Sequence, residues 1–232
     1  MLDDFPITKR WPAKDPNVIQ LYSLPTPNGV KVSAMLEETG LPYEPHLVNI
    51  MKDDQFTPEF LSLNPNNKIP AIIDPKGPGG KPFGLFETGA ILVYLAEKTG
   101  TFLPDDPARR YETLQWVMWQ MGGLGPMLGQ FGFFYAFGGK DIEDKRPMER
   151  YLNEGKRLLG VLDKHLEGKH FIMGDDYTIA DVASWPWVRA ITTGYKAEDI
   201  MGLSDYPNVM RWLAACLSRP ASEKAVNIPS RD

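Results

Sequence analysis

Apolar runs separated by glycine and proline predict alternating strands and helices in the N-terminal part of the chain. The β-branched and aromatic run at 18–24 suits a buried strand, and the proline- and glycine-bearing segment 25–29 ends it. Apolar residues then recur at helical spacing over 30–38, before Gly40 and Pro42 stop the helix. The same criteria predict a strand at 43–50, a short helix at 58–63, strands at 69–74 and 83–86, and a helix at 88–98.

The pattern changes after Pro104. No run from Arg109 onward suits a strand, and helical spacing predominates. The helices expected there cover 110–128, 148–165, 178–193 and 206–218. This second part of the chain is therefore expected to be all-helical.

These elements predict two domains. The order of the first part, β-α-β, a short α, then β-β-α, matches the thioredoxin arrangement of a mixed sheet flanked by helices. The polar, proline-bearing start of the chain has no periodicity, which is typical of an arm lying over the surface or reaching a partner subunit. We expect an arm at 1–16, a thioredoxin-like α/β domain at 17–103, a linker at 104–108 and an all-helical domain at 109–232.

Charge and composition exclude several classes of function. The net charge of −5, with acids and bases interspersed, leaves no basic stripe for nucleic acid. The longest strongly apolar stretch, at 90–96, is far below the roughly 20 residues that span a bilayer. The N-terminus lacks the basic and apolar regions of a signal peptide, so we expect a cytoplasmic protein without membrane or nucleic-acid partners. With one cysteine, Cys216, and three histidines, neither a disulfide framework nor a metal site is expected.

Three short motifs carry more specific information. Ile69-Pro70 opens a predicted strand, and an X-Pro bond is where a cis peptide occurs, although a trans proline also starts strands. At the start of the helix at 88–98, the Glu87 carboxylate can accept from an ammonium. The Thr88 hydroxyl and the free backbone amides of the first turn suit a carboxylate. The alternative is that Thr88 is a plain N-cap that needs no ligand. Thr178 and Asp181 form a capping box, to which we assign a folding role.

Together these motifs resemble the glutathione transferase superfamily. Within it, Thr26-Pro-Asn-Gly29, Asn64-Pro-Asn-Asn-Lys-Ile-Pro70 and the segment 115–130 are similar to the nu class and its yeast nitrogen-regulator relatives. The resemblance runs from about Val18 to Pro220. It implies a thioredoxin-like N-terminal domain with a mixed four-stranded sheet, an all-α glutathione transferase C-terminal domain, glutathione as co-substrate, and a homodimer.

The resemblance also implies the residues of the glutathione site. The cis-proline turn would present backbone groups to the cysteinyl part of glutathione, and Glu87 with Thr88 would grip its γ-glutamyl end. Arg150 would add a cation from the helical domain, although a solvated helix arginine is an equally good interpretation. The implied glutathione-binding set is Thr26, Asn28, Gln55, Lys68, Ile69, Pro70, Glu87, Thr88 and Arg150.

The start of the helix after 18–24 can activate a thiol. A free thiol with a pKa of about 8.5 is mostly protonated at neutral pH, so a glutathione-using site must favour the thiolate. Thr26 can cap this helix with Pro27 at its first position, leaving the amides of Asn28 and Gly29 at the positive end of the helix dipole. The nu-like pattern assigns Thr26 Oγ1 and Asn28 as the catalytic donors to the sulfur, the alternative being that both only cap the helix. Tyr22 is a rival, but a tyrosine within a strand more often packs.

The resemblance implies a glutathione-dependent disulfide-bond oxidoreductase that binds two glutathiones or glutathione disulfide and acts on small-molecule disulfides. Without a Cys-X-X-Cys motif, any redox sulfur must come from glutathione, and Cys216 is expected to be a buried packing residue. Conjugation of glutathione to small electrophiles, with weak peroxidase activity, and a non-catalytic regulatory role remain alternatives. The second-substrate pocket would be lined by Phe131, Phe133, Phe134 and Tyr135, unless these residues only pack.

Overall fold

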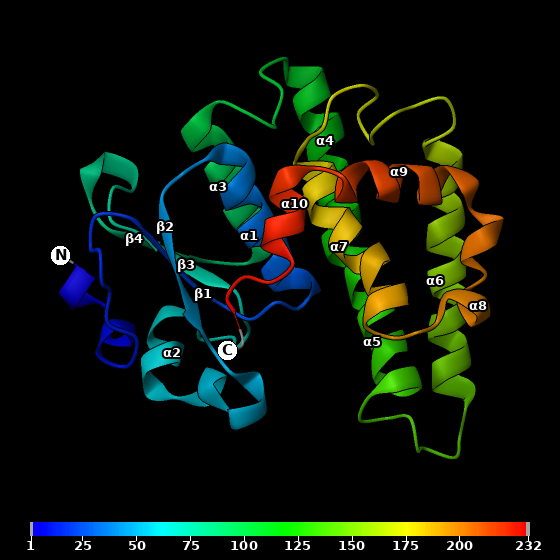
Figure 1. Cartoon of the computed structure of the whole chain (residues 1–232), viewed down its shortest axis with the longest axis horizontal. Helices are drawn as coiled ribbons and strands as arrows, with labels where there is room; N and C mark the ends of the chain where they lie inside the picture. The colour runs from blue at the N-terminus through cyan, green and yellow to red at the C-terminus, as the bar shows by residue number, and fades with distance from the viewer. Residues whose placement is uncertain (1, 231–232) are drawn as a thin grey trace. The chain divides into compact units, whose positions relative to one another are not determined.

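The chain divides into two compact units in the computed structural model, which describes residues 2–230 (Figure 1). One unit contains Met1–Gly100 together with Pro220–Asp232, and the other is Thr101–Arg219. Residues 1, 231 and 232, which belong to the expected arm and helical domain, lie outside the described residues. The segment from Pro220 onward groups with the first unit because helix α10 (Pro220–Ala225) packs on helix α1 (Pro27–Thr39). There the Ser33 hydroxyl donates to the Ala225 carbonyl at 2.9 Å.

The first unit contains a mixed four-stranded sheet, as predicted. Its strands lie in the order β2-β1-β3-β4, with β2 parallel to β1 and β3 antiparallel to both β1 and β4. The strand predicted at 43–50 ends earlier, because the Asn49 side chain accepts from the Met51 amide and begins a 3₁₀ turn. The strands are β1 (Ile19–Ser23), β2 (Tyr43–Leu47), β3 (Ala71–Asp74) and β4 (Phe83–Phe86). The helices are α1, α2 (Pro58–Leu63), α3 (Thr88–Thr99) and α10, with 3₁₀ turns η1 (Leu2–Asp4), η2 (Pro6–Lys9), η3 (Ile50–Lys52), η4 (Asp54–Phe56) and η5 (Pro78–Gly80).

Both faces of the sheet are buried. Tyr22 of β1 and Ala71 and Ile73 of β3 share one apolar cluster with Phe60 and Leu63 of α2. Because side chains alternate along a strand, the neighbouring strand residues point to the opposite face, where α1 and α3 pack against each other (Figure 1). All five residues of β1 and all four of β3 are buried, which agrees with central strands.

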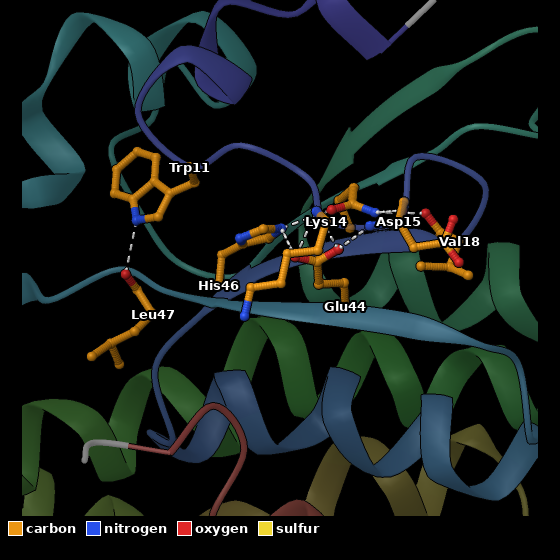
Figure 2. Close-up of polar contacts among 8 residues, drawn as sticks. Trp11, Lys14, Asp15, Val18, Glu44, His46 and Leu47 are labelled. Atoms are coloured by element: carbon orange, nitrogen blue, oxygen red, sulfur yellow. Dashed lines mark hydrogen bonds and ion pairs between the residues drawn. The ribbon is translucent and has the colours of Figure 1, made fainter.

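The N-terminal arm lies on its own domain. Ile7 is completely buried and Leu2 nearly so, both in the cluster that contains Tyr22 and Phe60. Trp11 Nε1 donates to the Leu47 carbonyl at 2.9 Å, at the end of β2 (Figure 2). The arm is therefore part of the core on this side of the sheet.

A carboxylate of β2 fixes the end of the arm. The two oxygens of Glu44 accept from the backbone amides of Lys14 and Asp15 at 2.9–3.0 Å (Figure 2). The buried Gln20 side chain donates to the Asp15 and Val18 carbonyls, both at 2.9 Å. Sequence analysis missed these contacts for two reasons. The contacts of Glu44 join residues that are distant along the chain, and those of Gln20 lie in a turn without periodicity.

The second unit is helical. Its helices are α4 (Pro107–Trp119), the π-helical turn η6 (Gln120–Leu124), α5 (Gly125–Ala136), α6 (Arg146–His165), α7 (Ile179–Thr193), α8 (Glu198–Met201), the 3₁₀ turn η7 (Leu203–Asp205) and α9 (Pro207–Leu217). Between 101 and 219 the backbone forms two isolated β-bridges but no strand. The helix predicted at 110–128 continues instead through η6 and α5. The glycines of this segment lower helix propensity but leave room for neighbouring side chains. A Cβ at Gly132, for example, would lie 2.5 Å from the Tyr195 ring.

The capping box expected at Thr178 and Asp181 begins α7. Asp181 is fully buried, and its carboxylate accepts from the Thr178 and Ile172 amides and from Trp212 Nε1, at 2.8–3.0 Å. Burial is the larger effect and raises the pKa of Asp181 to about 6. This carboxylate therefore joins the start of α7 to α9 and to the segment around Ile172 that precedes α7.

The buried arm predicts that shortening one of its apolar side chains lowers the stability of the protein. Ile7→Ala removes a completely buried side chain and should lower the free energy of unfolding by about 3 kcal/mol in urea denaturation. Lys9→Ala, at an exposed position of the same 3₁₀ turn, is the control and should change it by less than about 0.5 kcal/mol. An Ile7→Ala protein as stable as the wild type would contradict a docked arm.

The Asp181 cluster predicts a pH-dependent effect of Trp212→Phe. The folded pKa of Asp181 lies above the value of about 3.9 in an unfolded chain, so its contribution favours folding most at low pH and is lost as the pH rises through about 6. Trp212→Phe removes a donor to the ionised form, so we expect a loss of about 2 kcal/mol at pH 8 and a smaller loss at pH 5.

Urea denaturation at both pH values measures this difference. The control is Trp185→Phe, which removes an indole donor to the neutral Tyr177 hydroxyl and should cost the same at both pH values. An equal loss at pH 5 and pH 8 for Trp212→Phe would contradict the titration of Asp181.

Candidate active site

Strand direction brings four separate chain segments to one edge of the sheet. Tyr22 pairs with Ala71, and Ala71 pairs with Phe86, so the end of β1, the start of β3 and the end of β4 coincide. The parallel strand β2 ends beside β1, where Leu47 pairs with Ser23. The segments that leave or enter the sheet at this end carry Thr26, Gln55, Ile69-Pro70 and Glu87-Thr88.

The first segment is the start of α1. Thr26 is its N-cap, and Thr26 Oγ1 accepts from the Gly29 amide at 3.3 Å, while Pro27 takes the first helical position. Only glycine fits at residue 29, because a Cβ there would lie 1.8 Å from the Leu24 carbonyl oxygen. This contact seats the N-terminus of α1 directly on the end of β1. Thr26 and Asn28 are half-buried, so the positive end of the helix dipole is open to a ligand.

The second segment precedes β3. The Ile69–Pro70 peptide bond is cis, which confirms that prediction. The buried Asn64 side chain shapes the turn, donating to the Lys68 carbonyl at 2.6 Å and accepting from the Asn66 amide at 2.9 Å. Lys68 itself is exposed and Ile69 is half-buried. Sequence analysis gave Asn64 no role, although asparagines are typical of such side-chain-closed turns.

The third segment begins α3. Glu87 is the N-cap of α3 with φ 72° and ψ 112°, a conformation that non-glycine residues rarely adopt. Such backbone strain is concentrated at functional sites. The Glu87 side chain is exposed, whereas Thr88 is buried at the first turn. An exposed carboxylate beside a helix N-terminus can accept from an ammonium while the helix receives a carboxylate.

The fourth segment carries Gln55 in η4. The Asp54 carboxylate holds this segment, accepting from the Asn49 amide and pairing with Arg10 of the arm. Gln55 Oε1 is buried and makes no hydrogen bond to any residue in 2–230. A buried amide oxygen of this kind fits a site that receives a donor from a ligand.

A second buried side chain contacts this edge and was missed by sequence analysis. The Nζ atom of Lys31 on α1 lies 3.3 Å from Thr88 Oγ1. Lys31 is 1% exposed. Its one sequence signal is a charge between Val30 and Val32, two apolar residues that are also buried.

Tyr22 and Cys216 are not part of the open site. Tyr22 is completely buried, stacks on His46 at 4.8 Å and has its pKa raised by burial, which confirms the expected packing role. Cys216 is buried within α9. Neither residue can therefore meet a substrate without rearrangement.

The remaining expected site residues belong to the second unit. Arg150 on α6 has a 70% exposed side chain that lies 3.8 Å from Glu154. Phe131 is completely buried and packs against Tyr135 and Tyr195, which agrees with the packing alternative for this residue. The remaining aromatic candidates reach the surface to different extents: Phe133 is 45% exposed, and Phe134 and Tyr135 are half-buried.

The described residues contain neither a metal-binding cluster nor a membrane-spanning helix. Within 2–230, no cluster of three or more histidine, cysteine, aspartate or glutamate side chains could hold a metal ion. In the same part of the chain, no helix combines the length and apolarity that crossing a bilayer requires.

Comparisons with known proteins agree with this architecture. The family model described as "Glutathione S-transferase, N-terminal domain" matches residues 17–97, and that of the C-terminal domain matches residues 147–215. The disulfide-bond oxidoreductase YfcG of Escherichia coli (strain K12) is 48% identical over 210 residues, covering 90% of this chain and 94% of that protein.

Two solved structures are similar over nearly the whole chain. A glutathione transferase from Burkholderia graminis, with two glutathione molecules bound per subunit, is 63% identical with a TM-score of 0.98, covering 100% of this chain and 97% of its own. One from Pseudomonas putida, with one glutathione disulfide bound per subunit, is 60% identical with a TM-score of 0.96, covering 98% and 99%. The four converging segments, the two matched domains and these relatives show that the chain belongs to the glutathione transferase family.

Proposed function

We propose that the protein is a glutathione-dependent disulfide-bond oxidoreductase of the nu class. Its site binds two glutathiones, or one glutathione disulfide, at the sheet edge where α1 and α3 begin. The observation that carries this proposal is the start of α1, where Thr26 caps an accessible helix N-terminus and no cysteine is present. YfcG, a disulfide-bond oxidoreductase, and the relatives with bound glutathione or glutathione disulfide support it.

Two groups of residues bind different parts of glutathione, one at its sulfur and one along the rest of the peptide. Thr26 Oγ1 accepts from the Gly29 amide and keeps its own hydrogen to donate to the sulfur. The Asn28 side chain and the α1 dipole favour the thiolate further. Ile69 and the cis-Pro70 turn present backbone groups to the cysteinyl part, with Lys68 beside them, while Gln55, Glu87 and Thr88 hold the rest of the peptide. Arg150 adds a cation from the helical unit.

The reaction proceeds by two thiol–disulfide exchanges. The first glutathione thiolate attacks one sulfur of the substrate disulfide, forming a mixed disulfide and releasing one substrate thiolate. The second glutathione thiolate attacks the glutathione sulfur of this mixed disulfide, forming glutathione disulfide and releasing the other substrate thiolate. Protons from the two glutathione thiols end on the two product thiols. The protein's lone cysteine is buried, so no covalent enzyme intermediate is required.

Phe133, Phe134 and Tyr135 are proposed to line the pocket for the small-molecule disulfide. A cytoplasmic location fits this chemistry, because the cytosolic glutathione pool is kept reduced. Conjugation of electrophiles would use the same thiolate, so the assay below compares both reactions.

Removing either donor to the sulfur should slow disulfide reduction. For Thr26→Ala or Asn28→Ala, we expect kcat/KM for hydroxyethyl disulfide with glutathione to fall about 10–100-fold, or roughly 1.4–2.7 kcal/mol of lost transition-state stabilisation. The pH dependence of thiolate absorbance should show a higher pKa for bound glutathione in both variants.

Matched variants separate this effect from helix capping. Thr26→Ser keeps both the cap and the donor and should retain most activity, whereas Thr26→Ala also loses about 1 kcal/mol of stability. Wild-type turnover of a chloro-nitrobenzene exceeding that of the disulfide would favour a conjugating transferase. Glutathione binding without either reaction would favour a regulatory protein.

We also propose that the protein is a homodimer, with α4 in the interface. Tyr111 and Met118 lie seven residues apart on one face of α4 and are 72% and 60% exposed. Large apolar side chains exposed together are typical of interaction surfaces. The Burkholderia graminis and Pseudomonas putida relatives bind their ligands "per one protein subunit", which supports an assembly of subunits.

A charge in this face should separate the subunits. Met118→Asp leaves the core intact, and we expect the mass measured by light scattering during gel filtration to fall from that of a dimer to 26.1 kDa. Val161→Asp, an exposed apolar position on α6, is the control and should remain dimeric. A Met118→Asp protein that keeps the wild-type mass would place the interface elsewhere.

A further inference from the structure

The helical unit contains a hollow that the proposed reaction does not use. Its volume is about 420 Å³, within the range typical of small-molecule pockets, and it lies between α4 and the end of α6. Arg109, Glu112 and Trp116 line it from one face of α4, because residues three and four apart share a helix face. Tyr111 and Met118 belong to a different face of this helix.

Hydrogen bonds within the unit hold the walls of the hollow in place. Arg109 Nη2 donates to the Met173 carbonyl at 3.1 Å and pairs with Asp176 at 2.7 Å, which fixes the segment after α6 against the start of α4 (Figure 1). On the other side, His165 Nε2 lies 2.7 Å from the Ile172 carbonyl. The hollow is therefore formed in advance, and a ligand need not order a loop in order to bind.

Two aromatic rings form one wall of the hollow. The ring centroids of Trp116 and His165 lie 4.1 Å apart, and both side chains are half-buried. Because the Ile172 carbonyl can only accept, His165 Nε2 carries a hydrogen. Burial lowers the pKa of His165 more than the hydrogen bond to Ile172 raises it, and the charge of Lys169 lowers it further. The imidazole is therefore neutral at pH 7, and this wall suits a planar aromatic ring.

Lys169 supplies a cation beside this wall. Its Nζ atom lies 3.3 Å from both ring nitrogens of His165. A position equally close to both nitrogens lies over the face of the ring, because in the ring plane it would collide with Cε1. The ammonium therefore does not meet a nitrogen lone pair head-on. Within residues 2–230 the half-buried Lys169 forms no ion pair, so the hollow favours an anion beside it.

Acidic residues limit the charge that the hollow accepts. Glu112 lines it, and Glu167 lines an adjoining hollow that shares Trp116 and Lys169. Both carboxylates are exposed, and among the described residues neither is paired with a cation. A dianion would be repelled by these carboxylates, whereas Lys169 alone can match a single negative charge.

We propose that this hollow is a second ligand site, which binds a planar aromatic monocarboxylate. The ring of the ligand stacks on Trp116, and its carboxylate accepts from the Lys169 ammonium. The inference does not depend on the proposed function, because the lining residues belong to the helical unit and none of them is in the proposed glutathione-binding set.

Three related compounds separate the charge from the ring. The probe is 2-naphthoate; 2-naphthamide lacks its charge, and decahydro-2-naphthoate lacks its aromatic rings. For Lys169→Met, we expect calorimetry to show about tenfold weaker binding of 2-naphthoate, with 2-naphthamide changed by less than about twofold. Trp116→Leu should weaken both naphthyl compounds about tenfold and decahydro-2-naphthoate by less than about threefold.

A change of opposite sign and a matched control complete the comparison. Glu112→Gln removes a negative charge from the lining and should tighten 2-naphthoate binding about twofold without affecting 2-naphthamide. Lys140→Met removes an exposed lysine that precedes α6, whereas His165 ends this helix, and should change none of the three affinities.

Three results would overturn the proposal. They are a wild-type protein that does not bind 2-naphthoate saturably, displacement of 2-naphthoate by glutathione, and equal losses of 2-naphthoate and 2-naphthamide in Lys169→Met. If Trp116→Leu does not fold, the wild type decides the role of the ring, since decahydro-2-naphthoate bound as tightly as 2-naphthoate would contradict stacking. Should Lys169→Met not fold, Lys169→Gln replaces it in the same comparison.

Discussion

The pairing of β3 between β1 and β4 is the constraint on which the site depends. Because β3 runs antiparallel to both neighbours, its first residue lies beside the last residues of the other two strands. A glutathione-sized ligand needs contacts from several directions, and this topology supplies them from segments that are far apart in sequence. The cis Ile69–Pro70 turn, the cap of α1 and the start of α3 would have no common ligand if any one of these strands ran the other way.

Two helix N-termini at one edge give the site its electrostatic character. The starts of α1 and α3 carry the positive ends of their helix dipoles, which favour a thiolate and a carboxylate. An exposed Glu87 supplies the opposite charge for an ammonium. Helix ends of this kind favour a thiolate supplied by bound glutathione. A protein whose one cysteine is buried therefore needs no thiol of its own to act on disulfides.

Sequence reasoning succeeded where a local rule decides the structure. Helix α2 and strand β4 have the predicted ends because prolines, glycines and apolar runs delimit them. The cis proline followed from a motif. The continuation of α4 into α5 was missed because glycines at 122–132 lower helix propensity, yet neighbouring aromatic rings require some of them. An arm lying over the surface was one of two expectations, but its burial in the core was missed because Glu44 and Leu47 hold it from a strand distant in sequence.

Asp181 and Lys31 are both ionisable residues buried in their units, and each joins two helices. Asp181 is surrounded by donors that the chain itself provides at the start of α7 and from α9, as a structural carboxylate requires. The Nζ atom of Lys31 on α1 lies 3.3 Å from Thr88 Oγ1, and Thr88 is the first residue of α3. This contact holds the start of α3 against α1. The two helix N-termini at this end of the sheet are therefore fixed by side-chain contacts as well as by the strands that precede them.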